Sequence, residues 1–521
     1  MPGVHMPSAQ VCEQARLSRD PRFDGLFFTG VTSTRIYCRP VCPAPAPKPR
    51  NIIYYPSAAA AEAAGFRPCL RCRPELAPGD GAWRRGDDAM ARALKLIDAG
   101  LLAEQPLAVL ADRVHLGERQ LRRLFVERLG APPSGVHATR RLLFAKQLLT
   151  ETTMPITQVA LAAGFGSLRR FNTVFHEAYR MAPRELRKRE PSQVDDTLGL
   201  RLGFRPPYDF EAMLAFLRTR ALPGVEQVDH DAYARLIAPM AEGDAPGWLC
   251  VTRDAKDPHA LRLQVHGVPP ARLLEVVARV RRMFDLDAEP RTIADALSVH
   301  PRLSALVDAA PGVRLPSAWD GFELAVRAIL GQQISVAAAR TMAMRVAQRW
   351  GTPLANEAAP GLGHLFPTAA ALADADLESI GLISARAKTI RGVARAVLEG
   401  DVDFRTDATL EEFVERWTAL PGIGPWTAHY IAMRALGHPD AFPADDLVLQ
   451  RALPADGSRL TARALAAAAE AWRPWRAYSV IQLWRDASHA PTAAATAPGR
   501  SPARRTRPAH RARAAAPVSA E

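Results

Sequence analysis

Cysteine is scarce in this sequence, and long apolar runs are missing. Only six of the 521 residues are cysteines, which are too few for a disulfide framework and fit a reducing compartment. No apolar run reaches the roughly 18 residues that a membrane span needs. The start of the chain, which includes Glu13, lacks the apolar core of a signal peptide. We therefore expect a cytoplasmic protein without a membrane partner.

Acidic residues are in deficit. The chain has 54 Asp and Glu against 67 Lys and Arg, which gives a net charge of +13 and favours a polyanionic partner. Residues 491–521 contain six arginines, with Glu521 as the single acid and almost no large apolar residue. We expect this segment to be a disordered, solvated tail. The remaining length predicts about three or four domains with apolar cores.

Four of the cysteines are grouped near the N-terminus as two closely spaced pairs. Three residues separate Cys38 from Cys42, two separate Cys69 from Cys72, and 26 residues lie between the pairs. This spacing lets four sulfurs converge on one tetrahedral centre, which is a ligand set that Zn²⁺ prefers. We predict one zinc ion per chain, held by these four thiolates. The spacing leaves open whether the zinc is purely structural.

The residues around the cysteines resemble the N-terminal domain of the Ada family of alkylation-response proteins over about residues 10–78. The matching segments are Phe23-Asp24-Gly25, Thr32–Cys42 and Ala64–Pro74. The resemblance implies that zinc-bound Cys38 irreversibly accepts a methyl group from a methylated DNA phosphate. Three neighbouring arginines are candidates for holding that phosphate, namely Arg39, Arg67 and Arg71. Each of them taken singly also fits a solvated face.

Residues 87–189 carry apolar residues at helical spacing, in two similar units. In each unit a short helix and a glycine-containing turn precede a second helix, which begins at Glu118 in one unit and at Ser167 in the other. The side chains predicted to point outward from these second helices are Arg119, Gln120, Arg122 and Arg123, and then Arg169, Arg170 and Asn172.

This repeated pattern resembles the AraC-type DNA-binding domain, in which two recognition helices enter neighbouring segments of the major groove. Arg, Gln and Asn are side chains that read base edges there. A basic helix face alone is more often just solvated, but two repeats with intact turns favour nucleic-acid binding. The implied partner is promoter DNA, with RNA polymerase as a further candidate partner.

The most specific pattern lies in the last third of the chain. An apolar helical stretch stops at Pro421, turns through Gly422 and Gly424, and restarts as a helix at Pro425. The two glycines allow positive φ and expose backbone N–H groups at a helix N-terminus, where a DNA phosphate fits. This is the helix–hairpin–helix pattern, and it predicts a second DNA contact.

The C-terminal part resembles AlkA-type 3-methyladenine DNA glycosylases over about residues 198–488. The matching motifs are Pro206–Asp209, Arg327–Gln332, Leu420–Gly424, Asp445-Asp446 and Trp472–Tyr478. The resemblance implies that Asp446 is the catalytic carboxylate and that aromatic residues form the base pocket, namely Trp426, Tyr430, Trp484 and Phe216. Gln333 stands where such enzymes place an apolar wedge that fills the gap left by a flipped base.

The implied chemistry fits these residue types. An alkylated purine is cationic and is attracted to electron-rich rings by about 0.5–2 kcal/mol for each well-placed ring. A carboxylate stabilises the positive charge that develops on the sugar as the base departs. Strand-cleaving relatives carry a lysine where this chain has Trp426, so we predict a monofunctional hydrolase.

Two simpler interpretations apply to the same residues. The acidic pair precedes a helical-looking segment, so either acid could be a helix N-cap. We assign that role to Asp445 and reject it for Asp446. The tryptophans taken alone would more commonly be core residues.

The patterns together predict a multidomain α+β protein. Its predicted parts are an Ada-like zinc-binding domain (1–80), an all-α double helix-turn-helix domain (85–190), an AlkA-like α+β lobe (197–315), an all-α helix-hairpin-helix glycosylase domain (316–490) and a disordered basic tail (491–521). We expect an adaptive-response protein that repairs alkylated double-stranded DNA, regulates transcription, associates with the nucleoid and needs no small-molecule cofactor beyond zinc.

One alternative and one exclusion accompany this prediction. The alternative is a transcription regulator whose glycosylase-like half is inactive and only binds DNA. The string Pro-Cys-His-Arg, typical of O6-alkylguanine methyltransferases, does not occur in the sequence, so we do not expect that activity.

Overall fold

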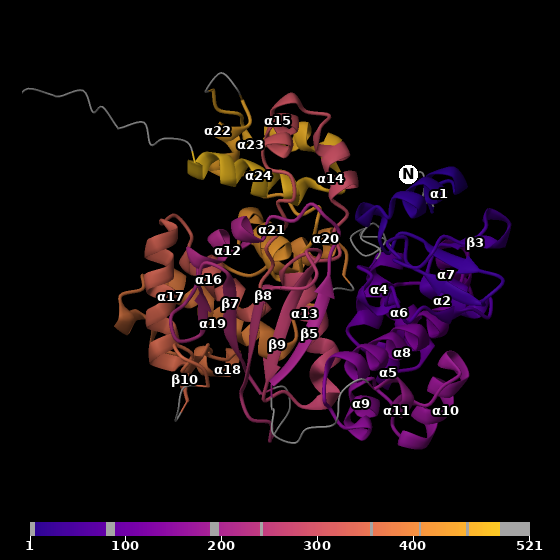
Figure 1. The fold of residues 1–521 in the computed structure, drawn as a ribbon. Coiled ribbons are helices and arrows are strands. Elements are labelled where there is room, and N and C mark those ends of the chain that lie inside the picture. The colour runs from indigo at the N-terminus through magenta and orange to yellow at the C-terminus, as the bar shows by residue number, and fades with distance from the viewer. Residues whose placement is uncertain are drawn as a thin grey trace, which may run out of the picture.

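The chain folds into four successive parts built from two main sheets, one short hairpin and many helices (Figure 1). The computed structural model describes residues 6–79, 89–187, 197–239, 243–354, 358–405, 408–454 and 458–489. The predicted disordered tail, 491–521, lies outside the described residues. Within the described ranges, no helix is long and apolar enough to cross a membrane.

The first part is a small sheet covered by short helices. The strand order is β3-β1-β2-β4, and the pairs are antiparallel except for β2 with β4. β1 pairs Thr29 with Cys38, so the first cysteine of the cluster lies at the end of a hairpin strand. The elements are α1 (Ala9–Ser18), β1 (Phe28–Val31), β2 (Ile36–Cys38), β3 (Ile52–Tyr55), α2 (Ala58–Ala63), β4 (Arg67–Pro68) and a 3₁₀ turn, η3 (Pro74–Leu76).

The second part is entirely helical. The elements are α4 (Ala89–Asp98), α5 (Leu101–Glu104), α6 (Leu107–Arg113), α7 (Glu118–Leu129), α8 (Pro133–Glu151), α9 (Ile156–Ala162), α10 (Leu168–Tyr179) and α11 (Pro183–Leu186). The predicted second helices of the two units are α7 and α10. Leu121 and Phe125 of α7 are buried, as are Phe171 and Phe175 of α10, so the opposite faces of both helices remain exposed.

The third part is an α+β lobe. Its antiparallel sheet has the order β5-β9-β8-β7-β6, and α12 and α13 accompany it in Figure 1. The elements are β5 (Thr197–Gly203), α12 (Phe210–Arg218), β6 (Glu226–Val228), β7 (Ala232–Ile237), β8 (Gly247–Arg253), β9 (Ala260–His266), η4 (Pro270–Arg272), α13 (Leu273–Met283), α14 (Pro290–Leu297) and α15 (Pro301–Ala309).

The fourth part is helical apart from the short hairpin of β10 (Thr352–Pro353) and β11 (His364–Leu365). The helices are α16 (Gly321–Leu330), α17 (Val336–Trp350), α18 (Ala369–Leu372), α19 (Ser384–Glu399), α20 (Leu410–Thr418), α21 (Pro425–Ala435), α22 (Leu447–Ala452), α23 (Ala462–Ala469) and α24 (Arg476–His489). A capping box of Thr409 and Glu412 starts α20, and Pro425 occupies the first turn of α21, where its missing N–H costs nothing. The predicted fold class is confirmed.

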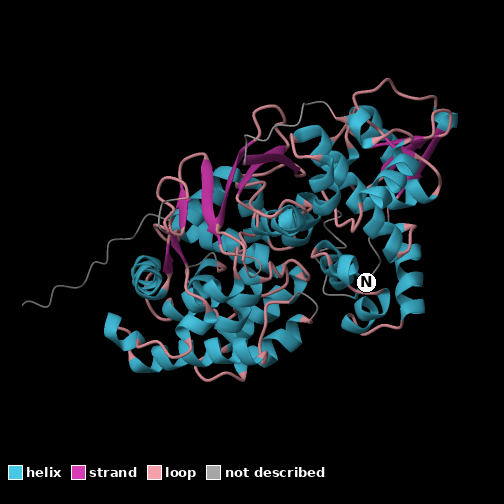
Figure 2. Cartoon of the chain, turned by 90° about the horizontal axis from the view of Figure 1, so that it is seen from below, coloured by secondary structure: helices cyan, strands magenta, loops and turns pink. Residues whose placement is uncertain are grey.

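The cores do not follow the predicted part boundaries. Leu297 and Leu303, from α14 and α15, belong to the core of the fourth part, and α15 packs beside α24. Leu149 and Phe175 of the second part share one core with Leu263 of the lobe sheet. Figure 2 shows the small sheet and the five-stranded sheet apart, with helices between them.

A buried ionic network joins the first three parts through α8. Lys146 of α8 donates to the Cys69 carbonyl at 3.2 Å and pairs with Glu75, and both ionic side chains are 1% exposed. Arg73 pairs with Glu75 at 2.9 Å and with Glu151, at the end of α8, at 3.0 Å. Glu151 also pairs with Arg201 of β5 at 2.7 Å. The loop that carries two cysteines is therefore connected to the lobe sheet.

The Lys146→Met variant tests this network. It should lower the free energy of unfolding by about 3–5 kcal/mol, because buried Glu75 loses the more deeply buried of its two charged partners within the described residues and keeps only Arg73. Chemical denaturation would measure the change. The matched control is Arg122→Met, whose pair with Glu118 has side chains 57% and 42% exposed, and which should cost less than about 1 kcal/mol. Equal denaturation midpoints for Lys146→Met and wild type would contradict the prediction.

Candidate active site and metal centre

A cavity of about 510 Å³ lies in the fourth part, bounded also by the lobe. Its walls include Trp426 and Tyr430 of α21, Trp484 of α24, and Asp446 immediately before α22. These four residues are spread over 59 positions of sequence, and packing among the three helices brings them to one place. Four of the five residues that the sequence assigns to catalysis and base binding in this half of the chain thus line one cavity.

Three of the aromatic rings form a continuous wall. Trp426 and Tyr430 are four residues apart on α21, so they lie on one helix face, and their rings stack at 5.2 Å and 11°. The Trp484 ring lies 6.1 Å from that of Tyr430, at an angle of 44°. Flat electron-rich rings in this arrangement can receive a planar cationic ligand.

The Asp446 carboxylate is held by four N–H donors. Oδ1 accepts from the backbone N–H groups of Val448 at 2.9 Å and Leu449 at 3.0 Å, and from Trp484 Nε1 at 3.3 Å. Oδ2 accepts from Trp426 Nε1 at 3.1 Å. No described arginine or lysine forms an ion pair with this carboxylate. The carboxylate therefore lies at the wall of the cavity without a charged partner among the described residues.

The assignment of the helix cap to Asp445 is wrong. Asp446 is the N-cap of α22, and Asp445 is exposed. The extended backbone of Asp446, with φ −68° and ψ 119°, turns its side chain back onto the first N–H groups of the helix. The Asp446 carboxylate can both cap the helix and line the cavity, because only its Oδ1 accepts the backbone N–H groups of α22.

The predicted pocket residue Phe216 has a different environment. Its ring is covered by the guanidinium groups of Arg220 at 3.8 Å and Arg434 at 4.6 Å. It is half-buried and does not line the cavity, whereas Arg220 and Arg434 do. Phe216 thus supports two cavity residues rather than facing a ligand.

The sequence reasoning missed the arginines of the cavity. Arg434 donates to the Tyr430 hydroxyl at 3.1 Å, and burial, with Arg220 and Arg327 nearby, lowers its pKa to about 10. Although burial raises the pKa of Tyr430, the arginines around it bring that pKa below its ordinary value. Arg434 follows Trp426 and Tyr430 at the same helical spacing, a signal that could have placed it on this face.

The helix–hairpin–helix turn joins α20 to α21. Gly422 has φ +86°, and a Cβ there would lie 2.0 Å from Thr389 Oγ1, so glycine is required. Gly424 is the exposed N-cap of α21 with φ −92°, so it does not use a positive φ. The side chain of Gln332 fastens the turn by donating to the Gly422 carbonyl at 3.1 Å. Its neighbour Gln333 is exposed, with φ +60°.

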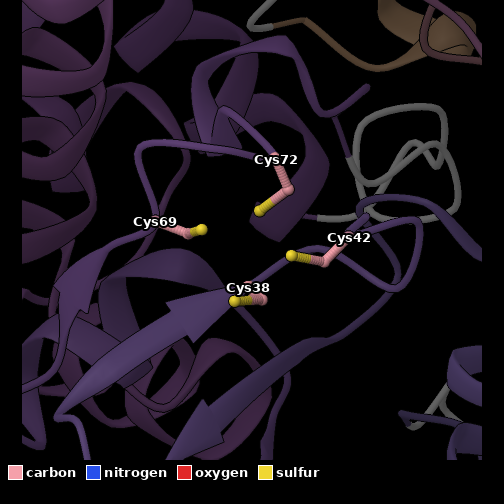
Figure 3. Close-up of side chains that lie close together, drawn as sticks. All are labelled: Cys38, Cys42, Cys69 and Cys72. Atoms are coloured by element: carbon pink, nitrogen blue, oxygen red, sulfur yellow. The ribbon is translucent and has the colours of Figure 1, made fainter. Parts of the chain in front are cut away.

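The four clustered cysteines meet at one point, as Figure 3 shows. Their sulfur atoms lie within 4.8 Å of one another. Four thiol groups at this separation fit a tetrahedral, thiophilic metal ion such as Zn²⁺. Cys69 and Cys72 are each 5% exposed, whereas Cys38 and Cys42 are half-buried.

The sulfurs also differ in their hydrogen bonds. Cys72 Sγ accepts the backbone N–H of Arg39 at 3.3 Å, and Cys69 Sγ accepts that of Arg71 at 3.4 Å. Within the described ranges, no backbone N–H donates to Cys38 Sγ. Cys38 thus combines partial exposure with a sulfur that lacks such stabilisation.

The three arginines predicted near the metal differ in availability. The guanidinium of Arg39 is enclosed, pairs with Asp24 and donates to the Cys72 carbonyl at 2.9 Å. It braces the cysteine loops, and these contacts leave little of it for a phosphate. Arg67 is half-buried and Arg71 is exposed.

The predicted recognition residues all lie on the solvent side of their helices. The exposed residues are Arg119, Gln120, Arg122 and Arg123 on α7, and Arg169, Arg170 and Asn172 on α10. Ser167 caps α10 by accepting the N–H of Arg170 at 3.2 Å. The contact of these side chains with DNA stays a prediction.

Models of four domain families match consecutive stretches of the chain. They are the metal binding domain of Ada (residues 11–75), a helix-turn-helix domain (110–189), the AlkA N-terminal domain (199–320) and the HhH-GPD superfamily of base excision DNA repair proteins (326–477). The fold and the sites therefore define a metal-binding, DNA-binding protein of the base excision repair class.

The chain is 38% identical over 493 residues to the probable bifunctional transcriptional activator/DNA repair enzyme AlkA of Mycobacterium tuberculosis, covering 92% of this chain and 96% of that protein. It is 37% identical over 287 residues to DNA-3-methyladenine glycosylase 2 of Escherichia coli, covering 54% and 95%. Among solved structures, 3-methyladenine DNA-glycosylase from Archaeoglobus fulgidus matches 56% of this chain and 99% of its own, with 23% identity and a TM-score of 0.48.

The chain belongs to the family of bifunctional transcriptional activators and DNA repair enzymes that includes the mycobacterial protein. The resemblances to the Ada, helix-turn-helix and AlkA families are confirmed.

The two hairpin glycines make a matched pair for substitution. Gly422→Ala should destabilise the protein by about 1–3 kcal/mol and weaken DNA binding, because the added Cβ collides with Thr389 and strains the turn. Gly424→Ala meets nothing within 4 Å and should cost less than about 1 kcal/mol. Thermal unfolding and DNA titration measure both effects. Equal losses in the two variants would argue against the geometric explanation.

Proposed function

We propose that this protein removes alkylated purines of the 3-methyladenine and 7-methylguanine type from DNA and regulates transcription in response to DNA methylation. The observation that carries the first activity is the position of Asp446. Its carboxylate lies in the wall of a cavity whose other sides include three stacked or tilted aromatic rings.

The cavity supplies what base removal requires. The target nucleotide must leave the duplex before its glycosidic bond becomes accessible. The alkylated base is cationic and is attracted to the rings of Trp426, Tyr430 and Trp484. As the base departs, the sugar gains positive charge, and the Asp446 carboxylate stabilises that charge and orients the attacking water.

The reaction proposed is hydrolysis without strand cleavage. A lyase needs an amine that forms a Schiff base with the sugar. No lysine is among the described residues that line the cavity, and Trp426 occupies the position that a lysine takes in strand-cleaving relatives.

Two features of the surface support the DNA contacts. The N-terminus of α21 exposes Gly424, and its N–H groups and helix dipole suit a phosphate. Gln333 projects from an exposed, positive-φ position near the hairpin. We assign Gln333 the wedge role, in which its amide hydrogen-bonds to the base left unpaired after flipping.

We further propose that Cys38 accepts a methyl group from a methylphosphotriester in DNA. One zinc ion per chain, bound by the four cysteines, would keep the sulfurs ionised. The Cys38 sulfur forms a bond to the methyl carbon, the methyl–oxygen bond breaks, and the electron pair leaves with the phosphate, which becomes an ordinary diester. Partial exposure separates Cys38 and Cys42 from Cys69 and Cys72, which also accept backbone N–H groups, and the resemblance to the Ada domain supports Cys38 of these two.

The methyl transfer would also act as a switch. Zn²⁺ with four thiolates carries a charge of −2, which DNA repels, and methylation of one sulfur reduces it to −1. The two helix-turn-helix units would then bind promoter DNA more tightly, and RNA polymerase would be recruited there. Arg71, the exposed arginine nearest in sequence to the cysteines, would contact the phosphate backbone of the DNA.

Release of free 3-methyladenine from alkylated duplex DNA tests the repair activity. Asp446→Asn should lower the rate roughly 100-fold or more, because a neutral amide does not stabilise the cationic sugar. Asparagine also caps helices well, so the variant should fold normally. Chromatography of the released base measures the rate. A wild-type protein that releases no base would instead favour a regulator with an inactive glycosylase-like half.

Mass spectrometry tests the methyl acceptor. After incubation with DNA that carries methylphosphotriesters, the protein should gain one CH₂ unit on Cys38 and should hold one zinc ion per chain. Cys38→Ser should gain none. Methylation of Cys42 instead would contradict the choice of Cys38, and no adduct on any cysteine would leave the zinc with a structural role.

A further inference from the structure

The two cavity tryptophans contact Asp446 through their indole nitrogens. Trp426 reaches Oδ2 at 3.1 Å from α21, and Trp484 reaches Oδ1 at 3.3 Å from α24. A wall of electron-rich rings uses only the faces of these rings. The contacts of the two N–H groups with Asp446 are therefore a second feature, separate from the wall.

The two carboxylate oxygens are held unequally. Oδ1 has three N–H donors, because the backbone of α22 supplies two of them. Oδ2 has one donor within the described part of the chain, the indole of Trp426. If that indole were lost, Oδ2 would have no donor within the described part of the chain. The carboxylate would then be held there through Oδ1, and Oδ2 could change its position.

We propose that Trp426 and Trp484 are positioning residues that orient the Asp446 carboxylate, with Trp426 dominant because it is the one donor to Oδ2 within the described part of the chain. This inference rests on the proposed glycosylase function. Indole N–H is a donor without acceptor capacity, and all four contacts to the carboxyl group are donors. Such donors fix the direction of the oxygen that accepts them, and they act more strongly in a partly enclosed site.

The Trp426→Phe and Trp484→Phe variants separate the two roles, because phenylalanine keeps an aromatic face and removes the N–H group. In Trp426→Phe, kcat for base release should fall roughly 10- to 100-fold, the range expected for one hydrogen bond to a charged group. Trp484→Phe should lose less, since Oδ1 keeps two backbone donors. KM should change little in either variant, because both keep a ring in the wall.

A control variant distinguishes positioning from general damage. The control is Trp248→Phe in β8, whose ring stacks on His266 at 5.7 Å and does not line the cavity. It should keep the wild-type kcat and KM.

A binding measurement makes the inference independent of turnover. DNA with a cationic pyrrolidine in place of the target nucleoside mimics the charged sugar, and Trp426→Phe should bind it more weakly than Trp248→Phe does. If the wild-type protein releases no base but the two variants still differ in this way, the glycosylase proposal is refuted and the positioning role is retained. Unchanged kcat in Trp426→Phe, a larger loss in Trp484→Phe, or equal binding of the pyrrolidine DNA by Trp426→Phe and Trp248→Phe would overturn the inference.

Discussion

The rest of the candidate site depends on the fixed carboxylate of Asp446. One of its oxygens caps α22 through two backbone N–H groups, and each oxygen also receives an indole N–H. A helix N-terminus is a favourable place for a negative charge, because the unpaired N–H groups and the helix dipole both stabilise it. The same interaction that starts α22 therefore keeps an anion at the edge of the cavity, where α21 and α24 add the aromatic wall.

The first two parts of the chain are connected to the lobe that borders this cavity. The second helix-turn-helix unit shares an apolar core with the lobe sheet, and α8 contacts both the cysteine loops and β5 through buried ions. Buried ion pairs contribute little net stability but penalise any arrangement that separates the partners. The metal centre and the lobe are thus held in one relative orientation, which suits a member of a family of bifunctional transcriptional activators and DNA repair enzymes.

Spacing by itself found the cysteine cluster, and the resemblance to AlkA-type glycosylases found four of the residues that line the cavity. Two short-spaced cysteine pairs admit few interpretations, and Trp426 with Tyr430 follows from one helix face. The assignments that failed or weakened depend on side-chain direction. Asp446 rather than Asp445 caps α22, Phe216 is covered by two arginines, and Arg39 is enclosed with Asp24.

The sequence by itself determined the order of the parts, the metal ligand set, the hairpin glycines and the residue types of the cavity, because local spacing and turn chemistry encode them. Only the tertiary structure decided that Trp484 meets Asp446 across 38 residues, that Arg434 lies in the same cavity, and that α8 links the cysteine loops to the lobe sheet. Such contacts arise from how helices pack, and packing depends on side-chain shape across the whole core rather than on any local pattern.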